Sequence, residues 1–286
     1  MNLEDLEKID SQKMCQTYDK WPDIAKQRYE QEFSRPEFKD IDHVVFAGMG
    51  GSGTIGDVFS SILSKNNIHT SVVKGYLLPK TVDSNTLVVA TSISGNTDET
   101  LTVLENSVKT NAKVIALSSG GKMEEVSSKN SIPYFKINQT HSPRASLLQF
   151  LYSTLNILQE FIPIKKADIT ESLSQLKNIQ KQICSSNLTD DNPALNLAKW
   201  INTIPVIYYP AGLQAAAIRF KNSMQENAKK HVITEDVIEA CHNGIVAWEE
   251  SSNLQPILIL GKDDYVKTKE RWKILKEFFQ IKNIEY

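Results

Sequence analysis

Glycine clusters in one short segment of the chain, which indicates a backbone that something must approach closely. Five of the 12 glycines fall between residues 48 and 56, in the sequence GMGGSGTIG. Glycine adopts positive φ and has no Cβ to block a ligand. A helix that begins beyond the cluster offers free N–H groups and the positive end of its dipole. The ligand that this segment is expected to bind is therefore an anion. The alternative is a tight turn that binds no ligand.

A second cluster carries hydroxyl groups. Ser92, Ser94 and Thr97 lie in ATSISGNTDET, where an apolar run gives way to a helical pattern. Each hydroxyl can donate to a phosphate oxygen, although serines in such positions also cap helices. In an open parallel sheet both clusters follow strand ends, where ligands bind. The two clusters together favour a phosphate monoester over a dinucleotide.

Two nucleotide-binding loops are alternatives for the glycine cluster. Gly48, Gly50 and Gly53 match the GxGxxG dinucleotide fingerprint. That site also needs an acidic residue after the next strand, to hold the ribose hydroxyls. The sequence there is VVKGY, with Lys74. A lysine suits a 2′-phosphate, so an NADP-dependent oxidoreductase stays open. Thr54 follows Gly53 where a Walker loop requires lysine, which excludes that loop.

Apolar runs alternate with helical patterns from residue 43, which is typical of parallel βαβ units. The expected strands of the first half are 43–48, 69–76, 85–92, 112–119 and 132–137. The expected helices are 54–64, 96–110, 123–129 and the long apolar 143–162. One or two further helices, interrupted at Trp21 and Pro22, are expected over residues 3–33.

The alternation pauses over the polar residues 163–192 and then resumes, which predicts two domains, 1–162 and 163–286. In the second domain we expect strands at 204–212 and 256–261, and the start of another at 282–286. Helices are expected from Pro193, over 213–229 and over 265–279. Both halves show an apolar strand, a glycine turn and a helix in that order, which favours a duplication.

Composition excludes several classes of protein. The net charge of −2 over 286 residues argues against binding of nucleic acid or anionic lipid through the overall charge of the protein. No apolar run approaches the roughly 20 residues of a bilayer span, and the acidic start does not suit a signal peptide. Cys15, Cys184 and Cys241 form no CxxC pair, and the five histidines form no HxxH pair. We therefore expect a cytoplasmic protein without metal or cofactor.

The motifs GMGGSG, TSISGNTDET and SPRASL resemble the sugar isomerase (SIS) domain. The contexts SMQENAKK and ACHNGIVAWEE extend the resemblance to the bifunctional phosphoglucose/phosphomannose isomerase family, over about residues 40–260. The resemblance implies an α/β fold of two SIS-type subdomains, each a mostly parallel sheet flanked by helices. It also implies a homodimer with its active site near the subunit interface, and conversion of glucose 6-phosphate and mannose 6-phosphate to fructose 6-phosphate.

The resemblance also assigns roles to residues. Arg144 would stabilise the charge of a cis-enediolate, and Glu226 would carry the proton between adjacent carbons. His242, from the partner subunit, would open the sugar ring. The residues that match the family's phosphate site are Gly50, Gly51, Ser52, Ser92, Ser94 and Thr97. Without the family context, we would expect Glu226 and Arg144 to be ordinary solvated side chains and His242 to be a capping or core histidine. Cys241 is an alternative nucleophile, but the sequence shows no base to activate it.

The chain departs from the family at its end. Relatives continue through another strand and a long helix, with a functional lysine close to the C-terminus, whereas this chain stops at Tyr286. We therefore expect a second sheet that lacks a part. A non-catalytic SIS protein that binds or senses sugar phosphates is the main alternative to an isomerase.

Overall fold

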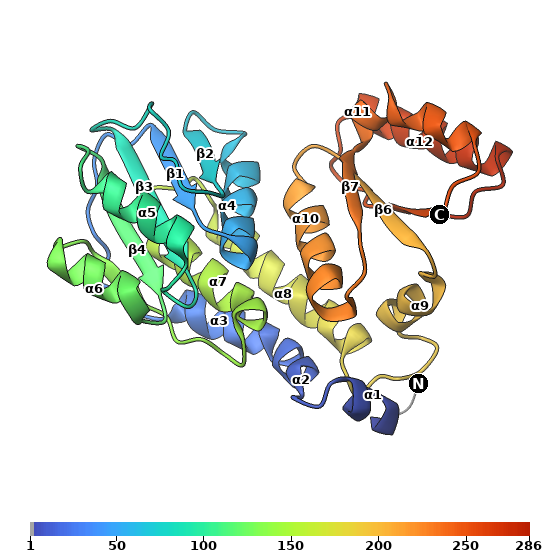
Figure 1. The fold of residues 1–286 in the computed structure, drawn as a ribbon, viewed down its shortest axis with the longest axis horizontal. Coiled ribbons are helices and arrows are strands. Elements are labelled where there is room, and N and C mark those ends of the chain that lie inside the picture. The colour runs from blue at the N-terminus through green and yellow to red at the C-terminus, as the bar shows by residue number, and fades with distance from the viewer. Residues whose placement is uncertain (1–2) are drawn as a thin grey trace. The chain divides into compact units, whose positions relative to one another are not determined.

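The computed structural model describes residues 3–286, which form two compact units (Figure 1). The first unit extends to Asn196, and the second is Leu197–Tyr286. This division lies later in the chain than the boundary predicted at residue 162. The reason is that helix α8 (Lys166–Ile183) packs on the core of the first unit through Ile169 and Leu173.

The first unit is built on a sheet of five parallel strands in the order β2-β1-β3-β4-β5. The strands are β1 His43–Ala47, β2 His69–Val73, β3 Thr86–Ser92, β4 Lys113–Ser118 and β5 Tyr134–Lys136. Every residue of β1 and β3 is buried, because helices and loops cover both faces of a parallel sheet. All five strands lie within the predicted ranges, and the predicted α/β class is confirmed.

Helices cover both faces of this sheet (Figure 1). The helical elements up to α7 are α1 Leu3–Ile9, α2 Met14–Asp19, α3 Trp21–Glu30, α4 Gly50–Leu63, α5 Asp98–Ser107, α6 Gly121–Lys129, the 3₁₀ turn η1 Pro143–Ser146 and α7 Leu147–Ile157, of which α4 to α7 supply the packing described next. On one face, Phe46 and Val89 pack with Phe59 of α4 and Phe150 of α7. On the other face, Ala90 and its neighbours pack with residues of α5 and α6. Large side chains thus fill one face, and small ones let helices approach the other.

Helix α4 begins earlier than predicted. The sequence pattern placed its start at residue 54, whereas the structure starts it at Gly50. The glycine cluster is therefore mostly the first two turns of a helix rather than a loop before it. Gly56 explains part of the cluster, because a Cβ there would lie 2.9 Å from Cβ of Phe46, so glycine allows the helix to pack close to β1.

The second unit has three parallel strands in the order β7-β6-β8. Its elements are β6 Ile204–Tyr209, α10 Gln214–Ser223, the π-helical turn η2 Met224–Ala228, β7 Ile233–Asp236, α11 Val237–Ala240, the 3₁₀ turn η3 Gly244–Glu249, β8 Leu254–Leu258 and α12 Val266–Ile281. Helix α9 (Pro193–Trp200) precedes them. Neither β7 nor α11 was predicted, because four residues that end in Glu235 and Asp236 show no apolar run.

The predicted start of a strand at 282–286 is wrong. These residues end helix α12 instead: Asn283 has φ +55°, and the N–H of Ile284 donates to the carbonyl of Phe279 at 2.8 Å. A residue in the left-handed conformation, followed by an N–H that donates to a carbonyl five residues earlier, is a common way for a helix to end. Ile284 then packs against the core of the second unit.

Candidate functional site

The two polar clusters of the sequence lie at neighbouring strand ends in the first unit. The chain leaves β1 toward β2 on one side, and β3 lies on the other side, so the β1/β3 gap is a topological switch point. Ala47 pairs with Ala90 across this gap. A Cβ on Gly48 would lie 2.9 Å from the carbonyl oxygen of Thr91. The turn after β1 and the turn after β3 are therefore adjacent.

The turn after β1 presents backbone to its surroundings. Gly50, the first residue of α4, has φ +52°, and no atom outside its own helix turn lies within 4 Å of the point where a Cβ would stand. Met49 occupies the N-cap position, and its side chain makes no capping hydrogen bond. The N–H groups of the first turn thus receive no acceptor from the side chain of the cap residue, while Ser52 lies buried beside them. Such an arrangement can bind an anion.

The turn after β3 holds its hydroxyls by mutual contacts. Ser92 Oγ lies 2.9 Å from Thr97 Oγ1, and the N–H of Gly95 donates to Ser92 Oγ at 3.1 Å. Thr97 occupies the N-cap position of α5 but makes no side-chain capping bond. Ser94 is exposed and accepts from the N–H of Asn96 at 3.2 Å. Capping of α5 therefore does not explain the presence of Thr97.

Gly95 fixes this turn against the next one. Its φ is +72°, and a Cβ would collide with the carbonyl oxygen of Gly120. The N–H of Met123, in α6, donates to the carbonyl of Gly95 at 2.9 Å. The hydroxyl cluster consequently rests on a rigid support from the following βα unit.

Arg144 lies on η1, at the start of the apolar helix α7, and is half-buried. Two hydrogen bonds fix the backbone of the residues next to it in the chain. Trp21 Nε1 donates to the carbonyl of Ala145 at 2.8 Å, and Ser146 Oγ donates to the carbonyl of Ser142 at 2.8 Å. The backbone at Arg144 is therefore well positioned by the N-terminal helices.

Glu226 lies on the π-helical turn η2 and is exposed. Lys229 ends this turn with φ +56°, and its Nζ donates to the carbonyl of Glu226 at 2.6 Å. Single π-helical turns at the ends of α-helices are frequent at functional sites, because they redirect a side chain. The sequence pattern predicted only a continuous helix here.

His242 is exposed and follows α11, so it lies beyond the carboxyl end of β7. Glu226 precedes the same strand in the chain. Four residues of strand span about 13 Å at the usual rise. Strand β7 therefore stands between the two residues in the chain order.

Comparison with known proteins agrees with this architecture. The SIS domain model matches residues 37–134, and the model of the bacterial phospho-glucose isomerase C-terminal SIS domain matches residues 190–286. A bifunctional phosphoglucose/phosphomannose isomerase of Caldicellulosiruptor bescii is 32% identical over 255 residues, which cover 85% of this chain and 74% of that protein. This chain belongs to the bifunctional phosphoglucose/phosphomannose isomerase family. The family resemblance of the sequence motifs is thereby confirmed.

Other similar proteins carry related names. The isomerase of this family from Thermoplasma acidophilum is 35% identical over 216 residues, which cover 76% of this chain and 64% of that protein. A D-glucosamine-6-phosphate 4-epimerase of Sulfolobus acidocaldarius is 28% identical over 88% of this chain and 78% of its own length. A solved putative phosphosugar isomerase from Silicibacter pomeroyi shares the fold, with a TM-score of 0.70, 13% identity and coverage of 94% of this chain and 83% of that one.

The second unit of this phosphoglucose/phosphomannose isomerase family member also contains an acidic group that the sequence analysis missed. Burial raises the pKa of Glu235, and the charges of Glu239 and Asp236 raise it further. Asp236 Oδ1 accepts from the N–H of Ile238 at 2.8 Å and so caps α11. Burial also raises the pKa of the Cys241 thiol, which argues against a thiolate nucleophile.

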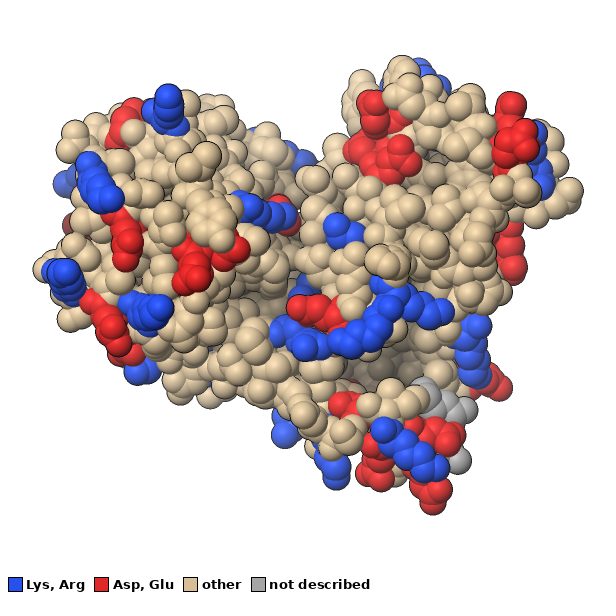
Figure 2. All heavy atoms as spheres, viewed as in Figure 1, with Lys and Arg blue, Asp and Glu red and all other residues tan. Residues whose placement is uncertain are grey.

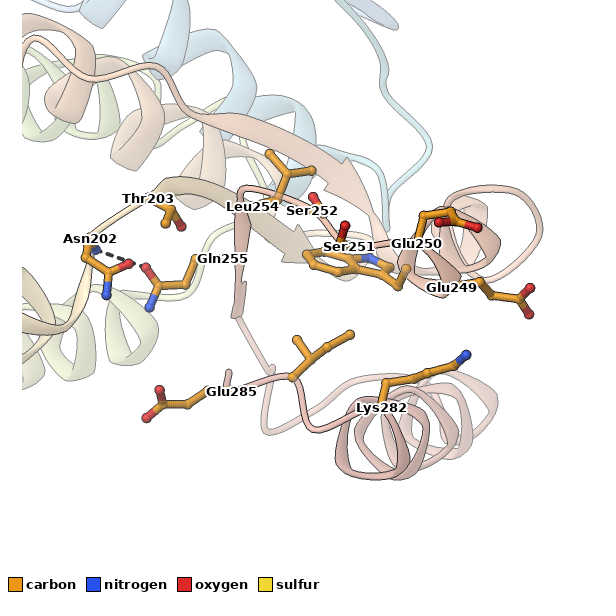
Figure 3. A pocket seen from close by; sticks show the side chains of 12 residues that line it. Asn202, Thr203, Glu249, Glu250, Ser251, Ser252, Leu254, Gln255, Lys282 and Glu285 are labelled. Carbon is orange, nitrogen blue, oxygen red and sulfur yellow. Dashed lines mark hydrogen bonds between the residues drawn. The ribbon is translucent and has the colours of Figure 1, made fainter.

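A cavity of about 410 Å³ lies in the second unit, beside β8 (Figure 3). Asn202 and Gln255 point toward one another in it, and the N–H of Asn202 donates to Gln255 Oε1 at 3.1 Å. Trp248 also lines it, with its Nε1 donating to Tyr208 Oη at 2.9 Å. Burial raises the pKa of Tyr208 to about 12, so that phenol stays protonated. None of the predicted site residues lines this cavity.

On the face drawn in Figure 2, basic and acidic side chains are interspersed. Among residues 3–286, no helix has both the length and the hydropathy of a bilayer span. Within the same range, no group of three or more His, Cys, Asp or Glu side chains could hold a metal ion.

Proposed function

We propose that this protein is an aldose–ketose isomerase of hexose 6-phosphates, which converts glucose 6-phosphate and mannose 6-phosphate to fructose 6-phosphate. The observation that carries the proposal is the adjacency of the glycine turn and the hydroxyl turn at the β1/β3 switch point. The names of the similar family members support the substrate class.

The phosphate group is the part of the substrate that the first unit holds. Backbone N–H groups at the start of α4 and side-chain hydroxyls from both turns donate to its oxygens. The proposed contacts come from Gly50, Gly51, Ser52, Ser92, Ser94 and Thr97. Each charge-assisted hydrogen bond contributes about 1.5–3 kcal/mol. Binding energy at this remote group positions C1 and C2 of the sugar for reaction.

The reaction moves one proton between two carbons. In the open-chain aldose, the Glu226 carboxylate removes the proton from C2, and the electron pair forms the C1–C2 double bond of the cis-enediolate. The former carbonyl oxygen on C1 gains negative charge, which Arg144 stabilises. The hydroxyl proton on O2 passes to the oxygen on C1, Glu226 returns its proton to C1, and the carbonyl forms at C2. His242 passes a proton between the ring oxygen and the C1 hydroxyl during ring opening.

The proposed assembly is a homodimer. In the chain, Glu226 precedes β7 and His242 follows it, which favours a site that takes the two residues from different subunits. In a two-fold dimer, each subunit can supply the residue that the other lacks. A complete site then uses Glu226 of one subunit and His242 of its partner.

A coupled assay tests the proposal. The 286-residue chain is given glucose 6-phosphate, mannose 6-phosphate or glucose, and fructose 6-phosphate or fructose is measured. We expect turnover of both phosphates and a kcat/KM for glucose lower by about 1,000-fold or more, because the phosphate contacts are lost. Similar kcat/KM values for glucose and glucose 6-phosphate would contradict the role of the two turns. The assay is repeated with a chelator, and unchanged rates are expected.

A sugar-phosphate binding protein without turnover is the second candidate. It is favoured by the contrast between the two units: the hydroxyl contact of Ser92 and Thr97 forms within one chain, whereas β7 stands between Glu226 and His242 in the chain order. Calorimetric binding of glucose 6-phosphate without fructose 6-phosphate formation would identify it. Glucosamine 6-phosphate belongs in the same assay, with product analysis at C4, because one similar protein is named a 4-epimerase of that sugar.

A further inference from the structure

The connection from β2 to β3 is unusual in this unit because it contains no helix. The two strands lie on opposite sides of β1, in the order β2-β1-β3. Residues 74–85 must therefore pass from the carboxyl end of β2, across β1, to the amino end of β3. The first residues of the connection, Lys74 to Leu77, lie at the edge of the sheet that also carries the phosphate turns.

Lys74 anchors this segment to α4. Its Nζ lies 2.6 Å from Asp57 Oδ2, and the side chain of Asp57 is only 11% exposed. Its methylene groups lie against the start of the helix, because a Cβ on Gly53 would be 3.1 Å from Lys74 Cε. The segment thus begins in contact with the first turns of α4, beside the glycines of the proposed phosphate site.

Tyr76 lies near the start of α5. The charge of the Glu99 carboxylate raises the pKa of Tyr76. Glu99 lies in the first turn of α5, two residues after Thr97. The segment is therefore fixed on α4 by Lys74, and Tyr76 follows two residues later, at the edge of the sheet that carries the phosphate turns.

The side chains that the segment presents are apolar and exposed. Tyr76 is 52% exposed and Leu77 is 84% exposed, next to turns that otherwise offer N–H groups and hydroxyls. A bound phosphate ester extends its sugar beyond the phosphate turns. An aromatic ring can pack on the C–H face of a sugar while its hydroxyl keeps a polar partner.

We propose that Tyr76 contacts the hexose part of the bound substrate and so determines specificity for a sugar phosphate over inorganic phosphate. This inference rests on the proposed function and assigns a residue to the sugar rather than to the phosphate. Lys74, held by Asp57, positions the segment that carries Tyr76. Tyr76 adds affinity only when a sugar is attached to the phosphate.

Calorimetric titration with glucose 6-phosphate and with inorganic phosphate tests the inference. We expect Tyr76→Ala to weaken binding of glucose 6-phosphate by about 10-fold and to leave binding of phosphate within about 2-fold of the wild type. Tyr76→Phe keeps the ring and should bind glucose 6-phosphate within about 3-fold of the wild type. The control is Tyr265→Ala, which removes a 72% exposed tyrosine from the second unit and should change neither affinity.

The outcomes separate the inference from the proposed function. Equal effects of Tyr76→Ala on both ligands, or no effect on either, would overturn the role of Tyr76 while the proposed function stands. A loss in Tyr76→Phe as large as in Tyr76→Ala would also overturn it, because the hydroxyl rather than the ring would then carry the effect. A wild-type protein that binds neither ligand would refute the proposed function and the inference together.

Discussion

Ser92 Oγ and Thr97 Oγ1 form a hydrogen bond of 2.9 Å across the turn between β3 and α5. Ser92 is buried, and the same oxygen accepts from the N–H of Gly95. Thr97 occupies the N-cap position of α5, but its hydroxyl bonds to Ser92 within the turn and does not cap the helix. The two hydroxyls are therefore already positioned by the protein, which lowers the entropic cost of binding a phosphate group.

Ser92→Ala should weaken glucose 6-phosphate binding by about 10- to 100-fold, because it removes one donor to the phosphate and the partner of Thr97. Calorimetry measures the affinity, and thermal unfolding checks the fold. The matched control is Ser127→Ala, a buried serine in α6 whose Oγ donates to the carbonyl of Met123. Equal affinities of wild type and Ser92→Ala would remove Ser92 from the site.

Gly95→Ala should lower the free energy of unfolding by about 3 kcal/mol or more. The cause is a Cβ that collides with the carbonyl of Gly120 at a φ of +72°. Urea titration measures the change. Gly75→Ala is the control, because no atom lies within 4 Å of a Cβ there, and it should change stability by about 0.5 kcal/mol at most. Equal stability of the two variants would show that the turn relaxes freely.

Glu226→Gln should retain glucose 6-phosphate binding but reduce kcat by about 100- to 10,000-fold, the range typical of a lost general base. The amide preserves size and removes the proton acceptor. Glu239→Gln, an exposed glutamate on α11, serves as the control and should keep wild-type kcat. Normal turnover in Glu226→Gln would assign the proton transfer to another group.

Mixing two inactive variants tests the shared site. If Glu226 and His242 act from different subunits, Glu226→Gln and His242→Asn should each be inactive alone. Subunit exchange at equal amounts should then restore about a quarter of wild-type activity, because half of the dimers are mixed and each has one intact site. If exchange is demonstrated by mass and no activity returns, each site takes both residues from one subunit.

Glu235 should make stability fall as the pH rises. Its pKa is raised in the folded protein above the ordinary value of 4.5, so the folded state favours the protonated acid. The contribution of the protonated Glu235 to the free energy of unfolding is fully present below pH 4.5. It is lost as the pH rises through the raised pKa of the folded protein. Glu235→Gln should raise the Tm by on the order of a degree or two at pH 7.5 and hardly at pH 4. A rise in Tm of Glu235→Gln at pH 4 but not at pH 7.5 would contradict the raised pKa of Glu235. The control is Glu249→Gln, which replaces an exposed glutamate.

Much of the fold could be predicted from local pattern. The five strands of the first unit were predicted because each contains neighbouring apolar or β-branched residues between turn residues. Strand β7 was missed because Glu235 and Asp236 form half of its four residues. The start of α4 was misplaced because glycine is a poor helix former, and the helix there is stabilised by packing of Gly56 against Phe46.

The sequence by itself determined which residues are candidates to bind a phosphate group, because residue type and spacing carry that chemistry. Only the tertiary structure decided that the turns after β1 and β3 are neighbours, that Lys74 at the end of β2 packs on α4, and that a strand, β7, forms between Glu226 and His242. The physical reason is that periodicity records what each segment buries, whereas strand order depends on pairing between segments far apart in the chain.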